Sequence, residues 1–365
     1  MTLPLPKNAE MHDEINRPIF VVGSPRSGTS ILAWCLGYHP NIFPVPESNW
    51  MGDFAVDVAR SYQVGAARGI FSILSAMGIS RDEFFSHIGR SINSLIIKHR
   101  GDLDQKRLII AVQRLLKEQG LYLGELTGEL DAATGAALRQ YGIADEANSL
   151  LYSELVDSLR TAASDSEHKT RWVDQTPEYS FHICGLRKLF PCALFIHIVR
   201  DVGSVVRSML NFHRIAGTNV VANEEEAYKY WLRTVRACLK AEEAYGPHVV
   251  CRLRYAALVE NPESALRSLL DFLGEPYSAK CLEPLSERIN SSNVPPDFKS
   301  DHPATDPAIV EEARRLSAEI EQTSRPTEHS PAAADELEAE FGTRIKHLAR
   351  SSIVHVTAET EHRIV

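Results

Sequence analysis

The stretch Arg17-Pro-Ile-Phe-Val-Val-Gly-Ser-Pro-Arg-Ser-Gly-Thr-Ser30 decides the fold. Its first part is a short β-branched and aromatic run that ends at Gly23, which predicts a buried strand. The apolar residues from Thr29 to Tyr38 then predict a helix, and His39-Pro40 predicts its end. A strand, a glycine-containing turn and a helix in succession bring several backbone N–H groups and the positive end of the helix dipole to one point. The stretch therefore predicts an anion-binding loop.

Further apolar runs predict three more strands, at 170–173, 193–199 and 249–255. Helical patterns follow two of them, at 178–190 and 262–273. These strands are continuously apolar rather than alternating, which is typical of a parallel sheet that is covered on both faces. We therefore expect an α/β fold: a P-loop NTPase-like parallel sheet flanked by helices, with an α-helical insertion.

Residues 55–165 interrupt the alternation of strands and helices, because their pattern is mostly helical and includes no convincing strand. We interpret them as the insertion, placed on the acceptor side of the site. The sequence predicts one domain over residues 1–365, with a core at about 17–54 and 166–300, the insertion at about 55–165 and C-terminal helices at about 305–350.

Composition excludes several classes of protein. The 365 residues carry a formal net charge of −9, which argues against nucleic-acid binding by bulk electrostatics. The first residues lack a basic region followed by an apolar run, and the longest apolar runs are too short to span a bilayer. The six cysteines form no CxxC pair. We expect a cytoplasmic protein without a transmembrane segment and without a nucleic-acid partner; a homodimer is left open.

The loop departs from the general phosphate-loop pattern GxxxxGK[ST], because Thr29 stands where the lysine belongs. The cation lies inside the loop instead, at Arg26. A loop without that lysine is poorly suited to magnesium-dependent hydrolysis of a nucleoside triphosphate. It suits a nucleotide phosphate held by backbone groups, hydroxyls and one guanidinium. The alternative is an ordinary glycine-containing turn of a parallel sheet.

A second pair of residues indicates a second anion. Arg200 follows the strand that ends at Val199, and Ser208 lies two turns along the helix that Asp201 is expected to cap. Ligands of open α/β sheets bind at the carboxyl ends of the strands. Arg200 and Ser208 are therefore candidates for a second phosphate, away from the loop. A nucleotide with two separated phosphate sites is not ATP.

These elements together resemble the sulfotransferases that use 3′-phosphoadenosine 5′-phosphosulfate (PAPS). Trp172-Val-Asp-Gln-Thr-Pro177 is similar to that family's Trp-x-Asp-Lys-Thr-Pro block. Arg254-Tyr-Ala-Ala-Leu-Val-Glu-Asn-Pro262, followed by Leu270-Asp-Phe-Leu-Gly274, is similar to its Arg-Tyr-Glu-Asp-Leu-Val and Phe-Leu-Gly blocks. The resemblance covers residues 18–47 and 170–276, less than half of the chain, with four blocks in the family's order.

The resemblance implies a PAPS donor, adenosine 3′,5′-bisphosphate as its product, and no metal. In the family a loop of this kind binds the 5′-phosphosulfate, and an arginine eight residues before a serine binds the 3′-phosphate. The donor-binding residues implied for this chain are Arg26, Ser27, Gly28, Thr29, Ser30, Arg200, Ser208 and Tyr255. The implied acceptor is the hydroxyl of a small molecule or a glycan.

Within the family, the order of loop, helix and His-Pro is most similar to the tyrosylprotein and polysaccharide branches. In the tyrosylprotein branch a glutamate shortly after His-Pro is the catalytic base, and Glu47 matches that position. An acceptor hydroxyl must lose its proton as it attacks sulfur, and a nearby carboxylate can take it. Arg26 is the second catalytic candidate. The alternative for Glu47 is an exposed loop carboxylate.

The chain also departs from the family pattern. Gln175 replaces the lysine of the Thr-Pro block, so a hydrogen-bond donor remains but its charge is lost. This leaves open a nucleotide-binding relative without transfer activity, with a P-loop nucleotide kinase as a weaker alternative. Ser291, Ser292 and Lys299 fall where the family has a mobile segment over the nucleotide. Several aromatic residues are candidates for the acceptor pocket or, at helical spacing, for the core: Trp34, Trp50, Phe54, Phe84 and Phe85.

Overall fold

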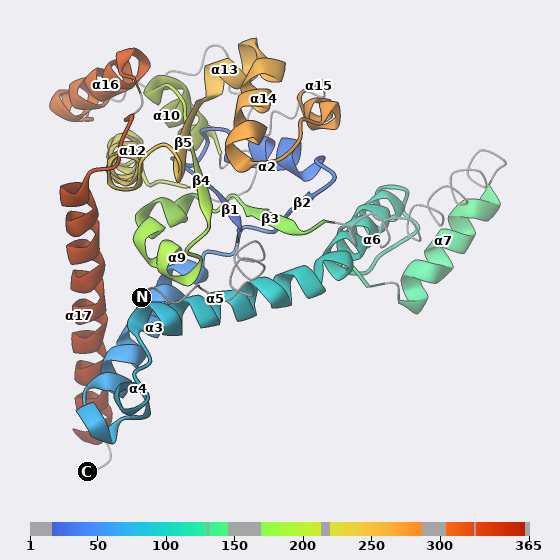
Figure 1. Cartoon of the computed structure of the whole chain (residues 1–365). Coiled ribbons are helices and arrows are strands. Elements are labelled where there is room, and N and C mark those ends of the chain that lie inside the picture. Colours follow the sequence, from blue (N-terminus) through green and yellow to red (C-terminus); the bar gives the residue numbers. More distant parts are fainter. Residues whose placement is uncertain are drawn as a thin grey trace.

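The structure is a computed structural model that describes residues 17–129, 131–144, 169–212, 220–286, 304–324 and 326–361. In these residues five parallel strands form one sheet in the order β2-β3-β1-β4-β5 (Figure 1). Their bounds are β1 Ile19–Val22, β2 Ile42–Pro44, β3 Arg171–Asp174, β4 Leu194–Val199 and β5 Val250–Arg254. The parallel sheet flanked by helices confirms the expected α/β fold.

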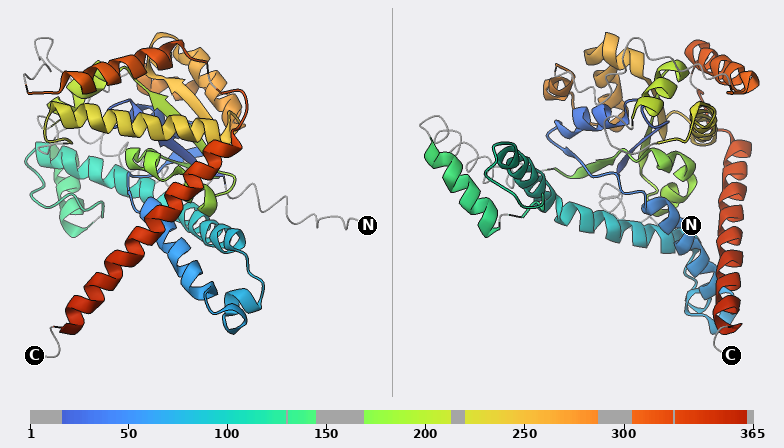
Figure 2. Two further views of the ribbon diagram at one scale, coloured as in Figure 1. Left: turned by 90° about the vertical axis from the view of Figure 1, so that its left-hand side faces the viewer. Right: turned by 180° about the vertical axis from the view of Figure 1, so that it is seen from behind.

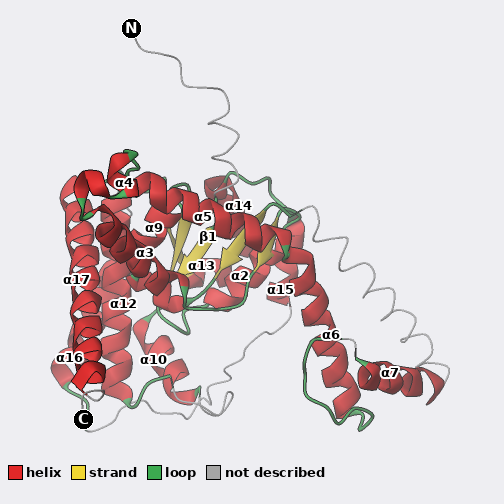
Figure 3. Cartoon of the chain, turned by 90° about the horizontal axis from the view of Figure 1, so that it is seen from below, coloured by secondary structure: helices red, strands yellow, loops and turns green. Residues whose placement is uncertain are grey.

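Side chains of the strands alternate between two hydrophobic cores, one on each face of the sheet. Phe20 and Val22 of β1 pack into one core, whereas Ile19 and Val21 pack into the other. Both faces are therefore buried, which explains the continuous apolar runs. Figure 3 shows the strands enclosed between helices. The second core is closed by α2 (Thr29–Gly37), α13 (Tyr255–Glu260), α14 (Pro262–Leu273), η4 (Ala279–Leu282) and α15 (Glu283–Ser286).

The part of the predicted insertion that the structure describes is helical. Residues 51–129 and 131–144 contain no strand, and their elements are α3 (Met51–Ala66), η2 (Gly69–Phe71), α4 (Ile73–Ala76), α5 (Arg81–Lys98), α6 (Arg100–Glu118) and α7 (Ala132–Ala144). Helices α3 and α5 pack against α9 (Ile183–Leu189) below the sheet. Helices α6 and α7 share a small core of their own and extend away from the sheet (Figure 1). The boundaries of the insertion stay a prediction.

Three helices complete the first core and its surroundings. Helix α12 (Glu224–Tyr245) was absent from the sequence prediction, and it lies across the sheet face formed by β4 and β5. Helices α16 (Pro307–Gln322) and α17 (Pro331–Glu361) follow the predicted C-terminal pattern. Figure 2 shows α17 crossing α12 and running on beside α3. No helix among the described residues combines the length and apolarity needed to cross a membrane.

One local prediction was wrong, and one strand was not predicted. The helix expected over 178–190 is divided into a 3₁₀ turn, η3 (Pro177–Phe181), and α9, because His182 leaves helical geometry at φ −122°. Strand β2 was missed because its three residues end in proline and are too short to give a pattern. The cap of α10 (Val202–Asn211) was correct, since the side chain of Asp201 accepts a hydrogen bond from the Ser204 N–H.

Candidate functional site

The loop of residues 23–30 joins β1 to α2 at the carboxyl edge of the sheet, and two glycines permit its path. A Cβ atom on Gly23 (φ +145°) would lie 2.4 Å from the carbonyl oxygen of Ile198. A Cβ atom on Gly28 (φ +103°) would lie 2.5 Å from the ring of Tyr255. Neither position accepts a larger residue without movement of its neighbours. The loop consequently packs directly against β4 and the start of α13.

The N-terminus of α2 presents unused hydrogen-bond donors. No side chain caps this end of the helix, and its first turn holds no acidic residue. The hydroxyl of Ser27 is buried and has no hydrogen-bond partner in the part of the chain that the structure describes. Uncapped N–H groups, the positive end of a helix dipole and an unpaired buried hydroxyl together suit an anion such as a phosphate. These residues fit the phosphosulfate group that the resemblance implies.

Two arginines lie against this loop. Arg26 has φ +71°, and its Nε donates to the Ser208 hydroxyl at 3.1 Å while its guanidinium lies 4.7 Å from the ring centre of Phe212. Arg200 donates from Nη1 to the Arg26 carbonyl at 3.3 Å, and its guanidinium stacks 4.5 Å from the ring centre of Tyr255. The aromatic rings thus hold both cations in place.

The electrostatic environment of Arg26 favours a bound anion. Burial lowers the pKa of the Arg26 guanidinium, the nearby charge of Arg200 lowers it further, and Glu47 partly opposes both effects. Two cations held this close repel one another, so a phosphate or sulfonate between them would relieve the repulsion.

The structure brings Arg26, Arg200 and Ser208 into one cluster. Ser208 is 2% exposed, and its hydroxyl accepts the hydrogen bond from Arg26. The sequence predicted Arg200 and Ser208 to hold a phosphate away from the loop; in this structure Arg26 links the two predicted subsites. The roles of these residues toward a donor stay predictions.

The backbone near Glu47 is held in place by hydrogen bonds of the residues that follow it. The Ser48 N–H donates to the Thr176 hydroxyl at 3.2 Å, and the Met51 N–H donates to the Tyr179 hydroxyl at 3.3 Å. The carboxylate of Glu47 is exposed at the rim of the cavity, yet the surrounding protein partly desolvates it. This desolvation raises the pKa of Glu47, Glu178 raises it further, and Arg26 lowers it.

The last residue of β3 and the two that follow it are buried near Glu47. Asp174 accepts hydrogen bonds from the N–H and the hydroxyl of Thr176, at 2.9 and 2.6 Å. Burial raises the pKa of Asp174 to about 6 against the effect of those hydrogen bonds, and the charge of Glu47 adds to the rise. The adjacent Gln175 is buried, and its Oε1 has no partner among the described residues. This amide occupies the position of the family lysine.

These groups surround a cavity of about 420 Å³. It is lined by most of the predicted residues, namely Arg26, Gly28, Thr29, Ser30, Glu47, Arg200 and Tyr255. Ser27 and Ser208 are buried and are not among its lining residues. Sequence reasoning missed Phe212, Pro177, Glu178 and Val220. Phe212 lies four residues after Ser208, so helical spacing was a usable signal for it. Nothing in the sequence marked Val220.

The remaining predicted residues divide between the cavity, the core and the surface. Trp34 lines the cavity and is 43% exposed, and Trp50 is similarly exposed, whereas Phe85 is fully buried as the core alternative expected. Phe54 and Phe84 are partly buried against the core. Ser291, Ser292 and Lys299 lie outside the described residues.

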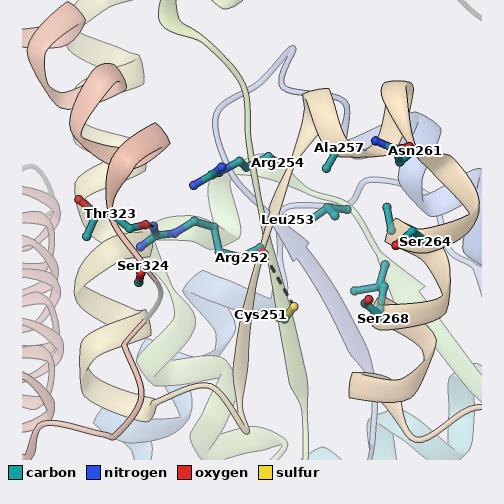
Figure 4. A pocket seen from close by; sticks show the side chains of 12 residues that line it. Cys251, Arg252, Leu253, Arg254, Ala257, Asn261, Ser264, Ser268, Thr323 and Ser324 are labelled. Carbon is teal, nitrogen blue, oxygen red and sulfur yellow. Dashed lines mark hydrogen bonds between the residues drawn. The ribbon is translucent and has the colours of Figure 1, made fainter.

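A larger cavity than this one lies elsewhere, along the outer edge of β5, with a volume of about 700 Å³. Figure 4 shows Arg252 and Arg254 extending from β5 toward Thr323 and Ser324, with Ser264 and Ser268 of α14 on the opposite side. No residue of the 23–30 loop lines it, and the Arg252 guanidinium is paired with Glu242. The loop cavity is therefore the better candidate for the site.

Comparisons with known proteins point to one family. Residues 111–279 match the model of the Sulfotransferase family, a span that includes Gln175, Arg200 and Ser208 but begins after the loop. The Omega-hydroxy-beta-dihydromenaquinone-9 sulfotransferase Stf3 of Mycobacterium bovis is 33% identical over 107 residues, which are 27% of this chain and 28% of that protein. An uncharacterized protein of Aquifex aeolicus is 26% identical over 270 residues, 73% of this chain and 26% of that protein.

The chain thus spans only about a quarter of the length of these two relatives. Among solved structures, sulfotransferase STF9 from Mycobacterium avium aligns with 88% of this chain and 82% of its own, at 16% identity and a TM-score of 0.40. This TM-score is too low to assign a fold, so the fold assignment rests on the sheet topology of this chain. The match over residues 111–279 confirms the resemblance that the motifs indicated: this chain is similar in sequence to the sulfotransferase family.

Proposed function

We propose that the chain transfers the sulfonate group of PAPS to the hydroxyl of a small molecule or a glycan. The observation that carries this proposal is the shared cavity, whose lining includes the N-terminal residues of the uncapped helix α2, two arginines and the carboxylate of Glu47. The helix N-terminus and the arginines therefore suit an anionic donor, and the Glu47 carboxylate offers a proton acceptor for an incoming hydroxyl.

The donor side is formed by the loop and its two arginines. When bound, PAPS supplies a sulfonate that is already activated for transfer. The N–H groups at the start of α2 and the hydroxyls of Ser27, Thr29 and Ser30 bind its 5′-phosphosulfate, and Arg26 balances the negative charge there. Arg200, Ser208 and Tyr255 bind the 3′-phosphate end. The arrangement needs no metal, because the guanidinium groups supply the positive charge.

The acceptor side depends on Glu47. Its carboxylate takes the proton of the acceptor hydroxyl while the hydroxyl oxygen bonds to sulfur and the bond between sulfur and the phosphate oxygen breaks. The leaving group is adenosine 3′,5′-bisphosphate. A raised pKa makes Glu47 a stronger base, and it also requires a higher pH before the carboxylate ionises. Arg26, next to Glu47, stabilises the charge that develops on the leaving phosphate.

A second candidate function is nucleotide binding without transfer. Gln175 favours it, because this buried amide stands where the family has a lysine and brings no charge to the leaving oxygen. Such a protein would bind adenosine 3′,5′-bisphosphate tightly and yield no sulfonated product.

The donor assignment is tested with Arg200→Ala and isothermal titration of adenosine 3′,5′-bisphosphate. We expect the affinity to fall about tenfold or more, since a hydrogen bond to a charged group contributes about 1.5–3 kcal/mol. Arg68→Ala removes an equally long, exposed arginine away from the cavity and is the matched control. An unchanged affinity in Arg200→Ala would refute the PAPS assignment.

The reaction is tested by transfer of a radiolabelled sulfonate from PAPS to panels of aryl, aliphatic and sugar hydroxyls. We expect product with the unaltered chain and a loss of about 10²- to 10⁴-fold in kcat for Glu47→Ala, with bisphosphate affinity retained. Tight bisphosphate binding without product in any panel would support the binding-only alternative. Magnesium-dependent turnover of ATP would instead support a nucleotide kinase.

A further inference from the structure

Glu178 is a second carboxylate in the same cavity as Glu47, and the proposed reaction leaves it without a role. It lies in η3, directly after the Thr-Pro block, and its side chain is only partly exposed. Tyr230 of α12 donates its hydroxyl hydrogen to Glu178 Oε1 at 3.0 Å. Burial raises the pKa of Tyr230 and the charge of Glu178 raises it further, so this tyrosine stays a donor at neutral pH.

The Tyr230 side chain is itself held in one orientation. Its ring stacks on Phe181 with 6.3 Å between ring centres and 13° between ring planes. Its contact with Glu178 spans 52 residues of sequence, so the interaction joins α12 to η3. The carboxylate of Glu178 is therefore directed by a rigid phenol rather than being free to turn into solvent.

The segment that carries Glu178 is also joined to the segment that carries Glu47. The Ser48 N–H bonds to Thr176, and the Tyr179 hydroxyl lies 3.5 Å from the Ser48 hydroxyl and accepts from the Met51 N–H. These contacts involve the residues next to each carboxylate. Together they keep two acidic side chains in one small cavity, although like charges repel.

The charged groups that act on Glu47 come from three elements. Arg26 of the loop favours its ionised form, whereas Glu178 of η3 favours its protonated form. The charge of Glu47 in turn raises the pKa of Asp174 at the end of β3, so these two acids also oppose one another. Arg200 acts more remotely, through Arg26. Of the two opposing acids, Asp174 is fully buried and bonded to Thr176, whereas Glu178 lines the cavity itself. Of these two acids, Glu178 is therefore the one whose charge can be removed without disturbing the buried residues at the end of β3.

We propose that Glu178, held by Tyr230, is a positioning residue that tunes Glu47 as the proton acceptor of the transfer reaction. This inference rests on the proposed function, because it is the proposed reaction that makes Glu47 a proton acceptor. The charge of Glu178 strengthens Glu47 as a base by disfavouring its charged form, and the hydrogen bond from Tyr230 holds the Glu178 carboxylate in place within the cavity.

The test titrates Glu47 directly, by NMR of protein labelled with ¹³C at the glutamate side-chain carboxyl carbon; Glu47→Gln assigns the resonance. Glu178→Gln keeps the size and the acceptor for Tyr230 but removes the charge. We expect its Glu47 midpoint at lower pH than in the unaltered chain. Tyr230→Phe should move the midpoint the same way, because the Glu178 carboxylate without its donor is free to turn away from Glu47 into solvent. Glu118→Gln, at the exposed end of α6, is the control and should leave it unchanged.

A second readout is the pH dependence of kcat/KM in the sulfonate assay. The acid limb should move to lower pH in Glu178→Gln, in step with the NMR midpoint. A purely structural role would lower the rate at every pH without moving that limb. An unchanged Glu47 midpoint in Glu178→Gln would overturn the inference. Absence of transfer in the unaltered chain would instead refute the proposed function, and the titration would still decide whether Glu178 acts on Glu47.

Discussion

Gly28 shows how much of the site depends on single residues. Its φ of +103° is a conformation that side chains with a Cβ atom rarely adopt, and the ring of Tyr255 occupies the space where that atom would lie. The same ring supports the guanidinium of Arg200. One glycine therefore sets both the path of the loop and the place of a cation that is expected to bind the donor.

Gly28→Ala should abolish the anion site. The new methyl group would force Tyr255 or the loop to move, and the unfavourable backbone conformation would cost roughly 1–3 kcal/mol of stability. We expect bisphosphate affinity to fall at least tenfold in isothermal titration. Gly342→Ala is the control, because a Cβ atom there meets nothing within 4 Å in α17. A Gly28→Ala protein with the affinity of the unaltered chain would show that the loop is not the phosphate site.

A buried ionic cluster of Glu242, His197 and Arg252 links helix α12 to strands β4 and β5. Glu242 of α12 accepts from Arg252 Nε at 3.0 and 2.9 Å and lies 2.6 Å from His197 Nδ1. Burial alone would lower the pKa of His197, but Cys238 and Glu242 outweigh it and raise the pKa to about 10. His197 lies within the buried run of β4, so its burial follows from the sequence pattern. The long-range partner that charges it was not visible there.

Glu242→Gln should destabilise the fold by about 3–5 kcal/mol, because Arg252 and His197 would lose the carboxylate that compensates their buried charge. Urea unfolding followed by circular dichroism measures this difference. The folded pKa of His197 exceeds its ordinary value of 6.5, so its stabilising contribution is complete below that pH and declines as the pH rises through about 10. Glu243→Gln, exposed on the next residue of α12, should change stability little. If both variants had the same free energy of unfolding, the cluster would not stabilise the fold as proposed.

At the scale of the whole molecule, α17 connects parts of the chain that are far apart in sequence. It packs against α12, α9 and α3, and its inward residues Leu337, Phe341 and Ile345 belong to the core that also covers β1 (Figure 2). This packing orients the start of the predicted insertion against the sheet. The loop that holds Glu47 leads directly into α3, so the docking of α17 also supports the acceptor side of the cavity.

Phe341→Ala should lower the free energy of unfolding by about 3–5 kcal/mol, since Phe341 is 5% exposed and its loss leaves a cavity between α17 and α9. Thermal and urea unfolding measure the effect. Lys346→Ala, on the exposed side of the same helix, is the control and should stay within about 0.5 kcal/mol. A Phe341→Ala protein as stable as that control would show that α17 contributes little to the fold.

Local sequence patterns were sufficient to predict those helices and strands whose ends are marked by glycine or by a capping residue. The strand, loop and helix around Gly23 to Ser30 were predictable because burial, glycine geometry and helix ends depend on residues close in sequence. The C-cap of α14 at Gly274 (φ +72°) and the N-cap of α10 at Asp201 follow for the same reason. Helix α12 was missed because its charged residues obscured its buried stripe, although its core face includes Trp231.

The sequence by itself determined the parallel sheet and the position of the glycine-containing loop between β1 and α2, because these depend on local patterns of apolar residues and glycines. Only the tertiary structure decided that Arg26 reaches Ser208, that Glu47 shares a cavity with Glu178, and that Tyr230 holds the latter. The physical reason is that these contacts join residues 52 to 182 positions apart. Hydrogen bonds and charge interactions depend on distance in space, and packing of the whole chain sets that distance.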